Sequence, residues 1–117
     1  MIDWDEPVVL VEGVFDAIAA GGNAIPILGS TLRERSRLFQ AIAVHDTPVY
    51  MALDGDAEKK AEWIIKSMLK YDLEVFKVPI DDEDVSEMGV EEFKERLQVS
   101  NPIKSEMYFF EKLLENI

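Results

Sequence analysis

The sequence contains no cysteine in 117 residues. The chain can therefore form neither a disulfide framework nor a thiolate metal site, and this composition fits the cytoplasm. It has no apolar run near the roughly 20 residues that a membrane-spanning helix requires. Its first five residues also lack the positive charge with which a secretory signal begins. We predict a cytoplasmic protein with no membrane role.

Positive charge is also scarce. Twelve lysines and arginines stand against 24 aspartates and glutamates, which gives a net charge of −12. Such a surface repels the phosphate backbone of nucleic acids unless something offsets the charge locally. With 48% hydrophobic residues, the chain is long enough for one domain with a substantial core and too short for two.

Short apolar segments alternate with amphipathic ones along the chain. We expect strands at residues 8–11, 24–28, 49–53 and 73–79, and helices at 15–20, 32–43 (capped by Ser30 or Thr31), 57–71, 90–99 and 105–117. This alternation predicts an α/β fold with about four strands in a mainly parallel sheet flanked by helices. We expect a catalytic domain over residues 1–99. An amphipathic C-terminal helix within residues 100–117 would pack on that domain or dock a neighbouring one.

Acidic residues follow three of the expected strands. Glu12 comes directly after the first strand, Asp54 and Asp56 after the third, and Asp82 and Asp84 after the fourth. The carboxyl ends of parallel strands meet at one edge of a sheet, so we expect these acids to gather there. Carboxylates that lie close together raise one another's pKa unless a cation is bound, and Mg²⁺ prefers such oxygen ligands. A lone Asp-Gly-Asp is more often an exposed turn, but the joint pattern predicts a metal site.

The residues of this pattern resemble the Toprim domain of bacterial and phage primases, topoisomerases and some small nucleases. The resemblance covers about residues 7–97, and its first motif is most similar to that of DNA primases and primase-helicases. Asp16 belongs to this motif, although a carboxylate at a helix start also favours the positive end of the helix dipole. The motifs are Leu10-Val11-Glu12-Gly13-Val14-Phe15-Asp16-Ala17, Leu28-Gly29-Ser30-Thr31, Ala52-Leu53-Asp54-Gly55-Asp56 and Asp82-Glu83-Asp84.

The resemblance implies a Rossmann-like Toprim fold and Mg²⁺-dependent nucleotidyl or phosphoryl transfer on nucleic acid, as in the synthesis of RNA primers for DNA replication. It implies two ions of Mg²⁺, or Mn²⁺, and a catalytic role for Glu12, Asp54 and Asp56. By the same resemblance the metal ligands are Glu12, Asp54, Asp56, Asp82 and Asp84, and the turn glycines are Gly13 and Gly29.

Two groups of basic residues lie near the predicted site. Arg33, Arg35 and Arg37 follow the Gly29 turn, and Arg33 and Arg37 would share one face of a helix. Lys59 and Lys60 follow the Asp-Gly-Asp segment. These side chains are candidates for contact with a nucleotide or a phosphate backbone, and a solvated helix face is an equally good interpretation.

The charge also bears on the partners. Two bound Mg²⁺ ions would still leave a net charge of −8. We therefore expect nucleic acid and nucleoside triphosphates to be bound through adjoining domains, with a replicative helicase or helicase domain as a possible partner. The chain would then be either an excised domain or a free-standing protein whose partner binds the nucleic acid.

Three other functions are compatible with the pattern in part. One is a free-standing Toprim nuclease, and another is a non-catalytic acidic interaction domain. A signalling module like a response regulator also clusters acids at strand ends, but it needs an acid pair after the first strand and a lysine after the last. This sequence has Glu12-Gly13 at the first position and no such lysine.

Overall fold

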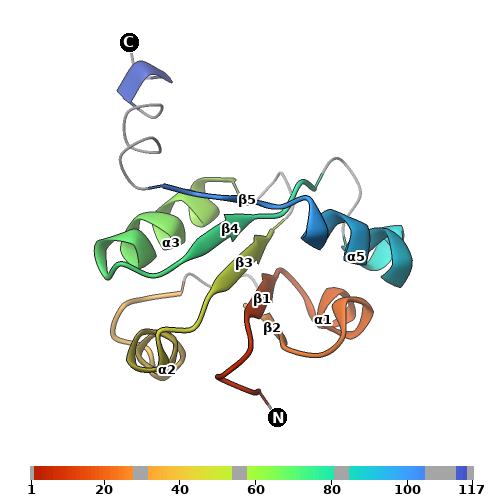
Figure 1. Cartoon of the computed structure of the whole chain (residues 1–117), viewed down its shortest axis with the longest axis horizontal. Coiled ribbons are helices and arrows are strands. Elements are labelled where there is room, and N and C mark those ends of the chain that lie inside the picture. The colour runs from red at the N-terminus through yellow and green to blue at the C-terminus, as the bar shows by residue number, and fades with distance from the viewer. Residues whose placement is uncertain (1, 28–31, 54–57, 81–84, 105–112, 116–117) are drawn as a thin grey trace.

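A computed structural model describes residues 2–27, 32–53, 58–80, 85–104 and 113–115, without the side chains of residues 58 and 59. Strands and helices alternate along most of this part of the chain (Figure 1). The elements are β1 (Val8–Val11), α1 (Val14–Ala20), β2 (Ala24–Pro26), α2 (Arg37–His45), β3 (Val49–Ala52), α3 (Glu58–Lys70), β4 (Val75–Lys77), α4 (Val85–Met88), α5 (Val90–Gln98) and β5 (Asn101–Pro102).

The strands form one sheet in the order β2-β1-β3-β4-β5. β1 pairs in parallel with both β2 and β3, and β3 pairs in parallel with β4. The predicted α/β class with a mainly parallel sheet is therefore confirmed. β2, whose proline suits an edge position, lies at one edge of the sheet.

A fifth strand was not predicted. β5 pairs antiparallel with β4, and the next residue, Ile103, donates its N–H to the Val75 carbonyl at 2.8 Å. The sequence predicted helices at 90–99 and 105–117, and residues 101 and 102 lie in the gap between them. Two residues are too few to show strand periodicity, and the proline fits only because this strand is at the edge of the sheet.

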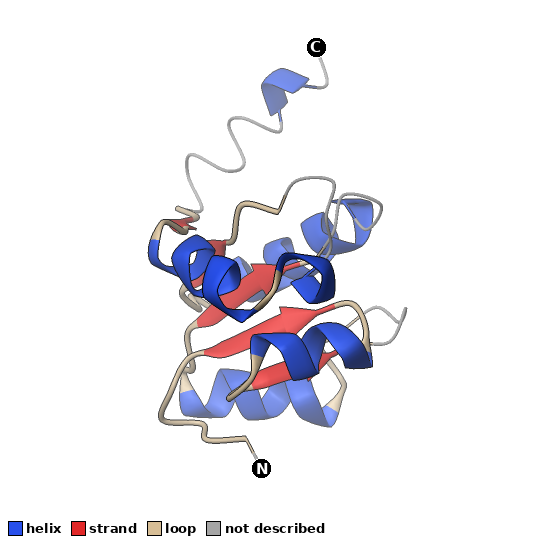
Figure 2. Ribbon diagram, turned by 90° about the vertical axis from the view of Figure 1, so that its right-hand side faces the viewer, coloured by secondary structure: helices blue, strands red, loops and turns tan. Residues whose placement is uncertain are grey.

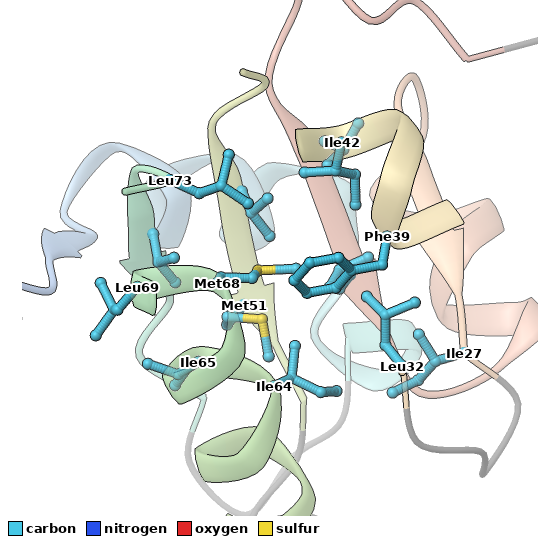
Figure 3. Close-up of a cluster of buried hydrophobic side chains, with 14 residues drawn as sticks. Ile27, Leu32, Phe39, Ile42, Met51, Ile64, Ile65, Met68, Leu69 and Leu73 are labelled. Atoms are coloured by element: carbon cyan, nitrogen blue, oxygen red, sulfur yellow. The ribbon is translucent and has the colours of Figure 1, made fainter. Parts of the chain in front are cut away.

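Helices cover both faces of the sheet (Figure 2), and the core has two layers, one on each face. Val8 and Leu10 of β1 point into the layer under α2 and α3, whereas Val9 and Val11 point into the layer under α1, α4 and α5. This alternation follows from the two-residue period of a strand, and burial of both faces explains why β1 is apolar throughout. Figure 3 shows the larger layer, in which Phe39 of α2 lies next to residues of β3 and α3.

The start of α2 differs from the prediction. The helix begins at Arg37 and not near residue 32, because Ser36 is its N-cap and its hydroxyl oxygen accepts the Phe39 N–H at 3.1 Å. The predicted caps, Ser30 and Thr31, lie outside the described residues. Since Arg33 precedes the helix, the prediction that Arg33 and Arg37 share a helix face is wrong.

Two further findings concern the helices. The short helix α4 was not predicted, because a four-residue helix is too short to show an amphipathic pattern. Within the described ranges, no helix combines the length and the apolar composition needed to cross a membrane.

Candidate functional site

The candidate site lies where β1 and its parallel neighbours end. Val11, the last residue of β1, is in register with Ala52, the last residue of β3. Glu12 follows β1 directly, so its side chain starts at the carboxyl edge of the sheet. Loops at this edge of a parallel sheet open into a common crevice, which is where α/β proteins usually bind ligands.

Glu12 forms an ion pair across this edge. Its Oε1 atom lies 2.8 Å from Nζ of Lys60, which is in the first turn of α3. The side chains are 27% exposed for Glu12 and 17% exposed for Lys60, so both are partly withdrawn from water. The other carboxylate oxygen of Glu12, Oε2, is buried and has no hydrogen-bond partner among the residues that the structure describes. A buried carboxylate oxygen without a donor is a natural ligand for a hard cation.

Asp16 forms a second connection at the same edge. It is the third residue of α1 and is only 8% exposed. Its Oδ2 atom accepts the Gly13 N–H at 3.1 Å, and its Oδ1 atom accepts the Ser86 N–H at 2.9 Å. One carboxylate therefore joins the turn after β1 to the beginning of α4.

Together these contacts place the Glu12 turn beside the residues that follow both acidic segments. Lys60, which contacts Glu12, comes four residues after Asp56 in the sequence. Ser86, which contacts Asp16, comes two residues after Asp84. The turn after β1 thus meets the starts of α3 and α4, the helices that follow the two acidic segments in the chain.

Several predicted site residues lie outside the described part of the chain. They are Asp54, Asp56, Asp82, Asp84, Gly29 and the side chain of Lys59. In the remainder, no three aspartates, glutamates or histidines are close enough to hold a metal ion. The metal site therefore stays a prediction, and Glu12 is its one described carboxylate.

The predicted arginines do not join this group. Arg33, Arg35 and Arg37 are all exposed, in the loop before α2 and at its first residue. Across the described ranges, no hydrogen bond or ion pair links them to Glu12 or Lys60. Among the predicted basic residues whose side chains the structure describes, Lys60 is the one that contacts Glu12.

Gly13 does not need to be glycine for backbone reasons. It is the N-cap of α1 with φ −129° and ψ 172°, a conformation open to any residue. A Cβ atom there would lie 3.6 Å from Oδ2 of Asp16, an ordinary van der Waals distance. Gly21, which ends α1 with φ +70°, is the glycine of this helix whose conformation other residues rarely adopt.

Comparison with known proteins adds one informative similarity. The crystal structure of the Aquifex aeolicus primase, comprising zinc-binding and RNA polymerase domains, matches with a TM-score of 0.68 and 26% sequence identity. This chain has a primase-like fold. The match covers 85% of this chain and 27% of the primase chain, so the chain spans about a quarter of that protein's length. The similarity supports a primase-related function at a coarse level.

Sequence comparisons do not extend this result. No protein-family model matches the chain, and no curated protein matches it in sequence. The primase-like fold consequently rests on the structural similarity, which extends over 85% of this chain at 26% sequence identity.

Sequence reasoning missed the connection through Asp16. It placed this residue in the first motif, or at the positive end of a helix dipole, but not against α4. No sequence signal could reveal the contact, since Asp16 and Ser86 are 70 residues apart and α4 itself was not predicted.

Proposed function

We propose that this chain is the metal-binding catalytic part of a primase-type nucleotidyltransferase, with a Toprim site at the carboxyl edge of its sheet. The observation that carries this proposal is the carboxylate of Glu12, which lies at that edge with one oxygen paired to Lys60 and the other buried without a described partner. The primase-like fold supports the same reaction class.

The proposed ligands are Glu12, Asp54, Asp56, Asp82 and Asp84, which hold Mg²⁺ or Mn²⁺. When bound, two such ions would neutralise charge at the phosphates and orient the attacking 3′-hydroxyl. The role of the chain is to position the carboxylates and to exchange protons with water or nucleotide, and Glu12 is the described group suited to accept a proton. Lys60 is suited to contact a phosphate once it is released from Glu12.

Nucleic acid binding is proposed to depend on other domains. The net charge of −12 opposes a phosphate backbone over most of the surface. In the similar primase, zinc-binding and RNA polymerase domains occur together in one chain. We propose that adjoining domains of this kind grip the template and bring nucleoside triphosphates to the acidic edge, with a helicase as a further partner.

Metal binding is the first test. Isothermal titration of the protein with Mg²⁺ or Mn²⁺ is expected to show saturable binding at up to two sites. A template-directed assay with single-stranded DNA and ribonucleotides, in the presence of the adjoining domains that bind them, then distinguishes the reactions. RNA product supports the transferase, and shortened DNA supports a nuclease instead. No saturable binding of either cation would contradict the proposal.

Substitution of Asp54 with alanine is expected to weaken Mg²⁺ binding strongly. At a ligand distance of about 2 Å, the attraction between one negative charge and a divalent ion is about 4 kcal/mol even in water, so we expect the affinity to fall by at least about a hundredfold. Titration calorimetry measures the change. Asp5→Ala is the control, because Asp5 is an exposed aspartate before β1. Equal affinities of Asp54→Ala and the unmodified protein would exclude Asp54 as a ligand.

Substitution of Lys60 with methionine is expected to have the opposite effect. Methionine keeps the length of the side chain and removes the cation that lies 2.8 Å from Oε1 of Glu12. With this competing charge gone, the affinity for Mg²⁺ should rise by about fivefold to tenfold. Lys70→Met is the matched control, since Lys70 pairs with Glu34 at the last residue of α3. An unchanged or weaker affinity in Lys60→Met would contradict the proposed competition at Glu12.

A further inference from the structure

Asp16 is a buried acid with more contacts than the capping of α1 requires. The bond from its Oδ2 atom to the Gly13 N–H is the usual contact of an acidic third residue with the start of its own helix. The bond from Oδ1 to the Ser86 N–H reaches a different helix, 70 residues later. A carboxylate in the first turn needs only the first of these bonds to cap the helix.

The two backbone groups that Asp16 holds belong to segments with proposed ligands. Gly13 is the residue after Glu12, and Ser86 is the second residue of α4, which follows the segment with Asp82 and Asp84. Hydrogen bonds from backbone amides to a carboxylate are strong, and the 8% exposure of Asp16 protects them from competition by water. Asp16 thus ties together two parts of the chain that are remote in sequence.

We propose that Asp16 is a positioning residue that fixes the Glu12 turn relative to the start of α4 and thereby sets the affinity of the site for divalent cations. This inference rests on the proposed metal site and extends it to a residue that is not itself a ligand. Both oxygens of Asp16 already accept hydrogen bonds from backbone amides, and the side chain is buried. Its role is therefore to hold the backbone at Gly13 and Ser86 in position and not to bind the cation. Ligands held in position before the cation arrives bind it more tightly than ligands that must first be ordered.

The primary test is the variant Asp16→Asn. Asparagine has nearly the same shape but an acceptor oxygen on only one side, whereas Asp16 accepts the two N–H groups on different oxygens, so the NH₂ group of asparagine would face one of these donors. We expect Mn²⁺ or Mg²⁺ affinity, measured by titration calorimetry, to fall by about 10- to 100-fold, the range seen when a group that orients metal ligands is lost. Amide hydrogen exchange in the metal-free protein should show faster exchange at Gly13 and Ser86.

The control separates positioning from general stability. Thr47 is 1% exposed and donates its hydroxyl to the Trp4 carbonyl at 2.8 Å, two residues before β3 and so at the opposite edge of the sheet. Thr47→Val removes this buried hydrogen bond and should lower stability without changing cation affinity. The inference is overturned if Thr47→Val weakens binding as much as Asp16→Asn. Wild-type affinity in a folded Asp16→Asn protein would also overturn it.

A second pair of variants tests the bond from the other side and covers the case in which Asp16→Asn does not fold. Ser86→Pro removes the N–H that Asp16 accepts, at a first-turn position where proline is tolerated. Ser86→Ala keeps that N–H and removes only the hydroxyl. Weaker cation binding in Ser86→Pro than in Ser86→Ala supports the inference, and equal binding overturns it.

Failure of this inference differs from failure of the proposed function. If the unmodified protein binds Mg²⁺ or Mn²⁺ and the variants bind equally well, Asp16 has no positioning role and the metal site stands. If the unmodified protein binds neither cation, the metal site itself is absent, and the inference falls with it.

Discussion

Replacing Glu12 with glutamine is expected to abolish Mg²⁺-dependent nucleotidyl transfer and to weaken cation binding by about a hundredfold. The change is almost isosteric but removes one unit of negative charge from the carboxyl edge of the sheet. Loss of an orienting group around a metal already costs about 10- to 100-fold in affinity, and loss of a direct ligand should cost at least the upper figure. Loss of proton transfer would lower the rate by a further factor of about 10² to 10⁴. Calorimetry measures the first effect and a primer-synthesis assay the second.

The control for this variant is Glu34→Gln. Glu34 also pairs with a lysine, Lys70, at 3.2 Å. The hydrogen bond with Tyr71, together with Lys70, holds the pKa of Glu34 below its usual value, so this residue is an ionised carboxylate at neutral pH. Lys60 and Lys70 are ten residues apart on α3, about 15 Å along the helix, which places Glu34 away from the proposed site. An unchanged cation affinity in Glu12→Gln, or an equal loss of affinity in Glu34→Gln, would remove Glu12 from the site.

Among the variants proposed for this protein, Phe39→Ala is expected to lose the most stability. Phe39 is 1% exposed and belongs to the larger core layer (Figure 3). Its ring meets the Tyr71 ring edge-on at a centroid distance of 5.5 Å. Truncation of a buried phenylalanine costs about 3 to 5 kcal/mol through lost burial and the remaining cavity. That is a large part of the total stability of about 5 to 15 kcal/mol expected for a domain. Urea denaturation measures the free energy of unfolding.

Phe15→Ala is the matched control, because it makes the same chemical change at a side chain that is 78% exposed on α1. It should alter the free energy of unfolding by less than about 0.5 kcal/mol. Similar losses in the two variants would mean that Phe39 is not in the core as described. The comparison tests the placement of α2 independently of the proposed chemistry.

The parts of the fold that the sequence predicts well are those with a clear period. The α3 stripe is the best case, because Ile64, Ile65, Met68 and Leu69 recur at helical spacing and all four are buried. Short elements show no period, which is why α4 and β5 were missed. The start of α2 was misplaced because residues 30, 31 and 36 are all of a type that can cap a helix, and the local sequence does not show which of them does.

The candidate site also has one part that the sequence predicted and one part that it did not. Glu12 was predicted from its place directly after a strand, and the structure puts it at the expected edge. Its pairing with Lys60, and not with an arginine of the 33–37 segment, depends on how α3 packs against β1. Glu12 and Lys60 are 48 residues apart in the sequence. The sequence alone does not show which of several basic side chains near the site will contact Glu12 in the folded protein.

By itself, the sequence determined the alternation of strands and helices, the parallel direction of the main strands and the edge at which Glu12 stands. These follow from local periodicity and from the few ways in which βαβ units connect. Only the tertiary structure decided that Lys60 neutralises Glu12 and that Asp16 joins the Glu12 turn to α4. Such contacts form between segments that meet only when the sheet and its helices pack, and no local pattern encodes which partners will meet.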